Sequence, residues 1–423
     1  MKHTLYILFL SFLIVSCGQE QRESGFVTAK DGQFFIGQTP YYYVGVNFWY
    51  GAILASTGEG GDRERLAKEL DFLQSIGVNN LRILVGADGE RGVFTKAEPT
   101  LQVAPNVYND TILDGLDFLM AELGRREMYA VLYLNNSWEW SGGYGQYLEW
   151  AGAGKAPIPN IDGWDKYLKF AAQFVQNDSA KRIFADYVDF IVTRTNRYTN
   201  IPYTEDKALM SWQIGNEPRA FAEENKDVFA EYILDVAKQI KNLDKNHLVS
   251  VGSEGKHGCE EDIALWAKIH SYPEIDYGTF HIWSLNWGWI DSTTIEQNVQ
   301  LACENTKEYI NEHLDILKQY GKPSVLEEFG YPRDNFSFAL GTPTTARDIY
   351  YRYVFNLISE KKNGFAGCNL WAWGGFAKPA HVFWQKGDDY AGDPAQEQQG
   401  LNSVFADDST VEIIKEANFK FSN

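Results

Sequence analysis

The sequence predicts a single (β/α)8 barrel with long loops at its C-terminal face and a short N-terminal β-hairpin. Short apolar or β-branched runs alternate with longer amphipathic stretches of helical period from Tyr41 to Trp373, and such alternation builds parallel sheets. There are eight of these units, whereas an open doubly wound sheet usually has fewer strands. No Gly-x-Gly-x-x-Gly motif follows the first predicted strand, which excludes a dinucleotide-binding fold.

The predicted strands are short runs rich in Val, Ile, Leu and Tyr, bounded by turn-forming or polar residues. In chain order they are residues 41–47, 78–84, 129–134, 208–214, 247–252, 277–281, 324–327 and 367–370. Amphipathic periodicity predicts helices between most of them, at residues 62–75, 110–126, 179–198, 221–243, 260–270, 299–320 and 344–362.

Two features flank this repeat. Residues 26–29 and 33–36 are apolar-rich and enclose Lys30-Asp31-Gly32, a hairpin signal, so we expect a hairpin that closes the bottom of the barrel. Long insertions enriched in Gly, Trp and Tyr follow the third strand, at residues 137–161, and the eighth, at residues 373–402. Both positions belong to the C-terminal face, where barrel active sites form.

The N-terminus indicates export. Residues 1–16 join a basic start to a short apolar core, and Ile14-Val15-Ser16-Cys17 resembles a bacterial lipobox in which Cys17 is acylated. We therefore expect a lipoprotein signal peptide at 1–16, a flexible tether at 17–24 and one (β/α)8 domain at 25–423. The protein would be anchored to the outer membrane, facing either the periplasm or the outside. Ordinary secretion is the alternative.

The overall charge excludes polyanionic partners. Asp and Glu number 57 against 38 Lys and Arg, for a formal net charge of −19. Such a surface repels nucleic acid and anionic lipid headgroups. The expected partner is therefore neutral or positive, and we expect the protein to be a monomer.

The cysteines and histidines indicate neither a disulfide framework nor a metal site. Once Cys17 is acylated, Cys259, Cys303 and Cys368 remain, an odd number. Either one pair forms, with Cys259–Cys303 favoured, or the thiols are small buried hydrophobes. No Cys-x-x-Cys, His-x-His or His-Glu-x-x-His motif occurs, so we expect no metal and no cofactor.

Two glutamates at predicted strand ends indicate the chemistry. Glu217 follows the fourth strand in Asn216-Glu217-Pro218, and Glu328 follows the seventh in Glu328-Phe329-Gly330. Glycoside hydrolysis needs such a pair, because one carboxyl group protonates the leaving oxygen while the other attacks or stabilises the anomeric carbon. For either glutamate alone, the alternative to a catalytic role is a structural role in a salt bridge.

These two motifs resemble glycoside hydrolase family 5, a family of retaining (β/α)8 glycosidases, and the resemblance spans residues 41–373. It implies that Glu217 is the general acid/base and Glu328 the nucleophile. Strand alternation would point the neighbouring Glu327 away from Glu328, so we expect Glu327 to be structural.

The resemblance extends to other strand ends. It implies that Arg82 donates a hydrogen bond to the nucleophile and that Asn216 binds the 2-hydroxyl of the sugar. It also implies that Trp371 lies beneath the sugar as a platform and is followed by a cis peptide bond to Ala372. We expect Arg82 to lower the pKa of Glu328, and Glu217, without such a cation, to hold its proton to higher pH.

The sixth strand contains one departure from the family pattern. His281 matches, but Trp283 replaces the usual Tyr that bonds the nucleophile. An indole can donate a hydrogen bond but cannot accept one or ionise. The auxiliary role at this position is therefore in doubt.

The substrate prediction is a β-mannan. Aromatic rings stack on pyranose faces, and several Trp residues, Trp138, Trp283, Trp371 and Trp373 among them, follow predicted strands. The residues that resemble the mannanase subfamily rather than the cellulases are Asn136 with the following Trp-Glu-Trp, Arg219 and Glu254. Arg219 and Glu254 would contact sugars on the leaving-group side.

The favoured function is thus a retaining endo-β-1,4-mannanase that acts on mannan, glucomannan or galactomannan. Three alternatives stay open: an endo-β-1,4-glucanase of the same family, a non-catalytic glycan-binding lipoprotein, and a metal-dependent barrel hydrolase. The last would need several histidines at strand ends, where the sequence has His281 alone.

Overall fold

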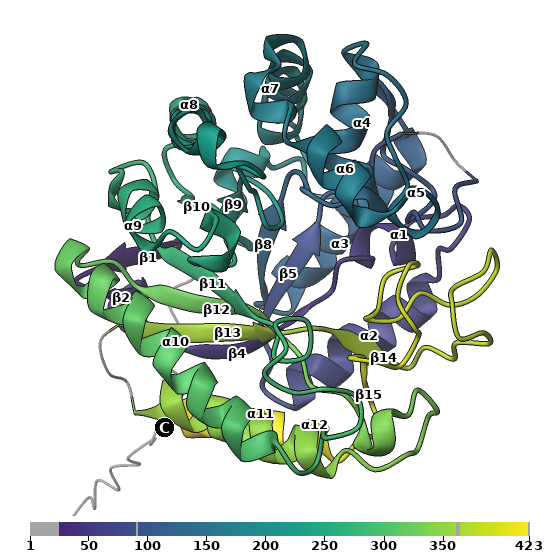
Figure 1. Ribbon diagram of the computed structural model, residues 1–423, viewed down its shortest axis with the longest axis vertical. Helices are drawn as coiled ribbons and strands as arrows, with labels where there is room; N and C mark the ends of the chain where they lie inside the picture. Colours follow the sequence, from purple (N-terminus) through teal and green to yellow (C-terminus); the bar gives the residue numbers. More distant parts are fainter. Residues whose placement is uncertain (1–24, 90–91, 361–363, 422–423) are drawn as a thin grey trace, which may run out of the picture.

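The computed structural model describes residues 25–89, 92–360 and 364–421. Eight parallel strands form one curved sheet surrounded by helices, which confirms the predicted barrel (Figure 1). Along the sheet the order is β10-β9-β8-β5-β4-β13-β12-β11. The strands are β4 (Tyr43–Asn47), β5 (Asn80–Leu84), β8 (Tyr129–Tyr133), β9 (Leu209–Gln213), β10 (Leu248–Ser250), β11 (Gly278–Ile282), β12 (Ser324–Phe329) and β13 (Phe365–Leu370).

The barrel is nearly closed between β10 and β11. The Asp276 backbone N–H donates to the Val249 carbonyl at 2.9 Å, and the Val249 N–H donates to the Asp276 carboxylate at 2.6 Å. The Asp276 carboxylate thus accepts the hydrogen bond that a backbone carbonyl of a neighbouring strand would otherwise accept between β10 and β11.

Helices cover the outside of the barrel. The predicted helix at 179–198 ends early, at Val192, because Arg194 and Arg197 turn back to bond the buried carboxylate of Asp117 at 2.8 and 3.0 Å. The helices of the barrel layer are α1 (Gly51–Leu54), α2 (Arg63–Ser75), α3 (Asp110–Arg125), α7 (Asp178–Val192), α8 (Lys226–Leu243), α9 (Ile263–Ser271), α10 (Val299–Tyr320), α11 (Thr345–Ser359) and α12 (Thr410–Phe421).

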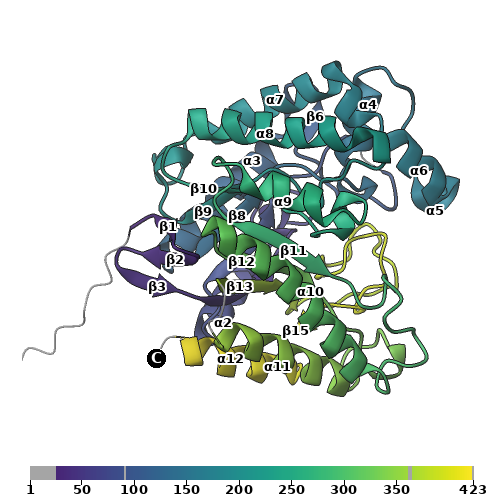
Figure 2. The same ribbon diagram turned by 60° about the vertical axis from the view of Figure 1, so that its left-hand side comes forward.

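The predicted hairpin is β1 (Val27–Lys30) paired with β2 (Gln33–Ile36), and a third strand that the sequence pattern did not reveal, β3 (Thr39–Tyr41), extends it. Phe34 and Val27 pack on barrel residues such as Met210 and Val325, so this sheet closes the bottom of the barrel as predicted. Figure 2 shows it at the end opposite the long loop before β15 (Val404–Phe405).

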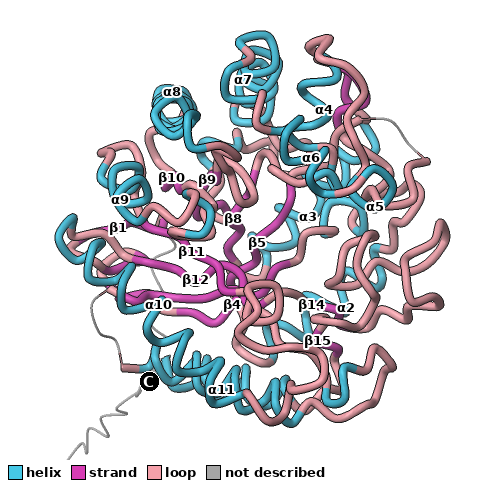
Figure 3. Tube along the Cα trace, in the orientation of Figure 1, coloured by secondary structure: helices cyan, strands magenta, loops and turns pink. Residues whose placement is uncertain are grey.

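Both predicted insertions are long loops on the other face (Figure 3). The first contains α4 (Gly143–Trp150) and leads into α5 (Pro159–Asp162) and α6 (Trp164–Ala171). The second connects β14 (Trp373–Gly375) to β15. A smaller hairpin, β6 (Gln102–Ala104) with β7 (Val107–Tyr108), lies between β5 and α3.

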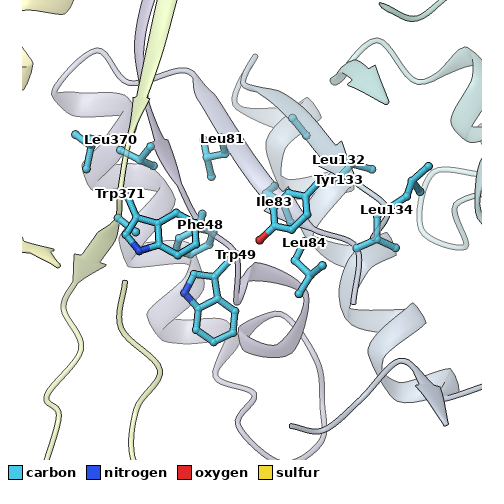
Figure 4. Packing of buried hydrophobic residues seen from close by; sticks show 14 of the residues in the cluster. Phe48, Trp49, Leu81, Ile83, Leu84, Leu132, Tyr133, Leu134, Leu370 and Trp371 are labelled. Atoms are coloured by element: carbon cyan, nitrogen blue, oxygen red, sulfur yellow. The ribbon is translucent and has the colours of Figure 1, made fainter. Parts of the chain in front are cut away.

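The core is continuous from the barrel interior to the helix layer. Figure 4 shows Leu81, Leu132 and Leu370 from three strands, with Trp49 and Trp371 nearer the strand ends. Cys259, Cys303 and Cys368 are buried free thiols, so the Cys259–Cys303 pair is wrong and the packing alternative holds. Among the described residues, no helix is both long and apolar enough to cross a bilayer.

Candidate active site

Glu217 and Glu328 face each other at the carboxyl ends of β9 and β12. One carboxylate oxygen of each lies within 4.8 Å of the other, and the two residues are only 6% and 2% exposed. Retaining glycosidases hold their carboxyl groups about 5–5.5 Å apart, whereas inverting enzymes need about 6.5–9.5 Å to admit a water molecule. The spacing therefore fits double displacement.

The backbone holds Glu217 in an uncommon conformation. Its φ is +51°, in the left-handed region that non-glycine residues rarely adopt. The Glu217 N–H donates to the Gly252 carbonyl at 2.9 Å, and the Asn216 N–H donates to the Asn135 carbonyl at 2.8 Å. These bonds tie the turn after β9 to the segments after β8 and β10. Backbone strain maintained by surrounding contacts is typical of functional sites.

Arg82 on β5 is fixed against Glu328, as predicted. One guanidinium nitrogen lies 2.5 Å from Glu328 Oε1, and the others donate to Gln213 Oε1 and to Asn216 Oδ1, each at 2.8 Å. The ring of Tyr133 lies 4.5 Å from the Arg82 Cζ. The buried Tyr133 hydroxyl has no hydrogen-bond partner among the described residues. Sequence reasoning missed Tyr133 because a tyrosine inside an apolar strand is typical of core packing.

His281 on β11 lies between the two carboxylates. Its Nδ1 is 2.8 Å from Glu217 Oε1 and 3.4 Å from Glu328 Oε2. Burial, followed by the charge of Arg82, lowers the pKa of His281 well below its ordinary value. A neutral imidazole is favoured there, and its Nδ1 shares a hydrogen bond with Glu217 Oε1. The Trp138 indole N–H donates to the other oxygen of Glu217.

Arg82 lowers the pKa of Glu328 as expected, but the expected net order of the two carboxyl groups is wrong. Burial raises the pKa of both carboxyl groups, and for Glu328 this outweighs the opposing charge of Arg82, while the nearby Glu217 raises its pKa further. Glu217 is not without a cation either, because Arg219 lowers its pKa. Two like groups so close in a buried site cannot both ionise easily, so the pair retains a proton to higher pH than free glutamates.

The expected orientation of Glu327 is also wrong. Between β11 and β12 the register shifts, so that Phe280 pairs with Leu326 and His281 with Glu328, leaving Glu327 as an extra residue. Such a bulge interrupts alternation. Glu327 consequently points into the barrel, where it accepts from Gln213 Nε2 at 2.7 Å and lies 3.9 Å from Arg82 Nε.

The predicted leaving-group residues pair with each other. Arg219 Nε donates to Glu254 Oε2 at 2.6 Å, and the Arg219 guanidinium lies 5.2 Å from the Trp138 ring. Asn216 Nδ2 donates to Asn136 Oδ1 at 3.2 Å, so the amide side chains that follow β8 and β9 are hydrogen-bonded to each other.

The tryptophans divide into two sets. Trp371 lies at the site, its cis peptide to Ala372 is present as predicted, and its ring is 6.2 Å from that of Trp283 and 6.3 Å from that of Trp140. Trp283 lies close enough to Glu217 to lower the pKa of that carboxyl group. Trp373, predicted to bind substrate, is not brought to the site.

Trp373 instead belongs to the packing between β14 and α2. It is completely buried, its indole N–H donates to Glu69 Oε2 at 2.7 Å, and its ring stacks on Phe72. Cys17 lies outside the described residues. A hollow of about 550 Å³ lined by α10, α11 and α12 lies on the outside of the barrel, among residues that contribute nothing to this site.

Comparison with known proteins agrees with this geometry. The solved structure of a glycoside hydrolase family 5 mannosidase from Rhizomucor miehei is 33% identical, with a TM-score of 0.87, covering 95% of this chain and 98% of that one. Mannan endo-1,4-beta-mannosidase 1 of Solanum lycopersicum is 28% identical, covering 86% of both chains. An endo-1,4-beta-mannanase from Rhizomucor miehei shares the fold, at 20% identity and a TM-score of 0.68 over 94% of this chain and 99% of that one. The family model described as GH family 5 beta-mannosidase-like matches residues 24–423, and this chain belongs to that family of glycoside hydrolases.

Proposed function

We propose that this protein hydrolyses β-1,4-mannosidic bonds of mannan, glucomannan or galactomannan with retention of configuration. The observation that supports this most is the buried pair of Glu217 and Glu328, with oxygens within 4.8 Å of each other at the ends of two barrel strands. The mannan specificity is inferred from the relatives, which include curated mannan endo-1,4-beta-mannosidases and a family 5 mannosidase structure in complex with mannosyl-fructose.

In the proposed first step, Glu328 attacks the anomeric carbon while Glu217 protonates the departing glycosidic oxygen. This forms a glycosyl ester with Glu328 and releases the shortened chain. In the second step, Glu217 takes a proton from water, which attacks the same carbon and frees Glu328. Two inversions give net retention. Arg82 holds the attacking carboxylate in place, and Asn216 would bond the sugar 2-hydroxyl.

An exo-acting β-mannosidase is a second candidate. Glu217, Glu328 and Trp371 are 6%, 2% and 3% exposed, so the cleavage site is largely enclosed. The Rhizomucor miehei relative at 33% identity is likewise a mannosidase by name. Mass analysis of early products from mannohexaose separates the modes, because an exo enzyme at first yields only mannose and mannopentaose, whereas an endo enzyme cleaves internal bonds and yields oligomers of intermediate length.

Initial rates on locust bean gum and carboxymethyl cellulose test the substrate class. Cleavage of the mannan with little cleavage of the cellulose derivative is the expected result, and the reverse would identify a glucanase. No hydrolysis of either would favour the non-catalytic binding lipoprotein. The ligand atoms of Glu217, His281 and Glu328 lie close enough to share a cation, so full activity in EDTA is the expected control against the metal-dependent alternative.

A further inference from the structure

Glu327 is a buried carboxylate that the proposed reaction does not use. It precedes Glu328 in β12 and is completely buried. Its Oε2 accepts a hydrogen bond from Gln213 Nε2 at 2.7 Å, and the Tyr277 hydroxyl lies 3.4 Å from its Oε1. Arg82 Nε is 3.9 Å from Oε2, which is too far for a direct hydrogen bond. Glu327 can therefore act on Arg82 through the groups that lie between them.

The Gln213 amide connects the two charged groups. Arg82 Nε donates to Gln213 Oε1 at 2.8 Å. Gln213 Nε2 donates to Glu327 Oε2 and, at 3.0 Å, to Ser250 Oγ. A carboxylate only accepts hydrogen bonds, so Glu327 can bind the NH2 end of the amide but not its oxygen, whereas the Ser250 hydroxyl can bind either end. Glu327 therefore keeps the amide oxygen of Gln213 directed at Arg82.

Asn47 forms a second connection, through the main chain of Glu327. Asn47 Nδ2 donates to the Glu327 carbonyl at 2.7 Å, and Asn47 Oδ1 accepts from Arg82 Nη1 at 3.0 Å. The bulge in β12 directs the Glu327 side chain into the barrel. The carboxylate and the carbonyl of this one residue thus hold both amides that present an oxygen to the guanidinium from below the catalytic pair.

These two amides fix the direction of the Arg82 side chain, because a guanidinium is planar and its donors form a rigid fork. In this orientation Arg82 Nη1 also reaches Glu328 Oε1 at 2.5 Å. We propose that Glu327 is a positioning residue: through the two amides it orients Arg82, and Arg82 in turn holds the attacking carboxylate of Glu328. The inference rests on the proposed function, since it takes Glu328 as the nucleophile.

Substitutions at Glu327 test this, with kcat and KM measured on mannohexaose. Glu327→Leu removes the acceptor, and we expect kcat to fall about 10- to 100-fold, as loss of a hydrogen bond to a buried charged group implies. KM should change less than about threefold, because no contact with the sugar is lost. Glu327→Gln retains an acceptor oxygen and should keep kcat within about threefold of wild type. Ser250→Ala removes the neutral partner of the same NH2 group and is the matched control, with kcat and KM unchanged.

A double-mutant cycle shows whether the effect passes through Arg82. Lysine lacks the guanidinium fork, so in an Arg82→Lys background Glu327→Leu should lower kcat less than about threefold. An equal loss in both backgrounds would overturn the inference, as would an unchanged kcat in Glu327→Leu alone. If Glu327→Leu does not fold, Gln213→Met, which removes the intervening amide, is tested in its place with the same expectations.

NMR provides a readout that does not require activity. The Arg82 Nε–H signal, identified by its absence from Arg82→Lys, should exchange with water at least about tenfold faster in Glu327→Leu than in wild type or Glu327→Gln. Unchanged exchange in Glu327→Leu would refute the orienting role. A wild-type protein inactive on both mannan and carboxymethyl cellulose would instead refute the proposed function, so the two failures are distinguishable.

Discussion

The two carboxyl groups proposed to be catalytic are distinguished by the neighbours they contact. Glu328 forms an ion pair with Arg82, whereas Glu217 accepts a hydrogen bond from Trp138 and shares one with His281. Burial raises the pKa of both, so the pair is able to hold one proton near neutrality, which double displacement needs at the start of each cycle. The contacts of each carboxyl group therefore agree with the roles proposed for Glu217 and Glu328.

Replacement of the nucleophile should be recoverable chemically. Glu328→Ala removes the attacking oxygen, and we expect kcat/KM on a β-mannoside to fall at least about a thousandfold, or ~4 kcal/mol of barrier. Azide can then attack in its place, so azide should restore turnover and yield the α-mannosyl azide, detected by NMR. If Glu217→Ala gave the α-azide instead, the roles would be reversed.

The pH profile should report the charge of Arg82. That charge lowers the pKa of Glu328, so Arg82→Met should raise it. Because Glu328 attacks only when ionised, the acid limb of kcat/KM would move to higher pH. Arg82→Lys preserves the charge and should shift the limb less. An unmoved acid limb in Arg82→Met would show that Arg82 does not set the ionisation of Glu328.

At the scale of elements, irregularities in otherwise regular strands build the site. The extra residue in β12 turns Glu327 inward beside Glu328, so that both approach the guanidinium of Arg82. At the opposite end, the sheet β1–β3 covers the barrel bottom without touching this chemistry. Stability and catalysis are thus assigned to opposite faces, as is common in this fold.

This division predicts separate effects of two neighbouring substitutions. Phe34→Ala removes a completely buried ring from the sheet β1–β3 and should destabilise the fold by about 3–5 kcal/mol. Phe35→Ala, on the other face of the strand and half-buried, should cost less than half of that. Urea unfolding measures both. Activity of the folded Phe34→Ala protein should match wild type, and a lowered kcat/KM at low temperature would contradict the assignment.

For the molecule as a whole, the acidic surface suits a neutral substrate. The formal net charge is −19, and because a mannan has no charge, the resulting field neither attracts nor repels it. Encounter with a neutral polysaccharide should therefore not depend on electrostatic steering.

Salt tests this directly. Between 20 mM and 500 mM NaCl, kcat/KM on a neutral mannan should change less than about twofold, because screening alters only interactions between charges. Carboxymethyl mannan, which has negative charges, is the control and should be cleaved faster as salt rises. A steep salt dependence on the neutral polymer would show that charged groups govern its binding.

The anchor is a proposal at this scale as well, based on Cys17 and its lipobox. In a Gram-negative host, the full chain should fractionate with membranes and partition into Triton X-114, whereas Cys17→Ser should be soluble or remain unprocessed. Equal partition of the two proteins would refute lipidation and favour ordinary secretion.

The barrel, the sheet that closes its bottom and the placement of Glu217 and Glu328 at strand ends were predictable from the sequence, because these depend on local signals: strand–helix alternation, a turn flanked by apolar runs, and short motifs at strand ends. Tertiary structure alone decided the rest. A register shift turned Glu327 inward, burial outweighed Arg82 in raising the pKa of Glu328, and packing against α2 removed Trp373 from the site. Each of these depends on which distant residues meet, and no local pattern in the chain records that.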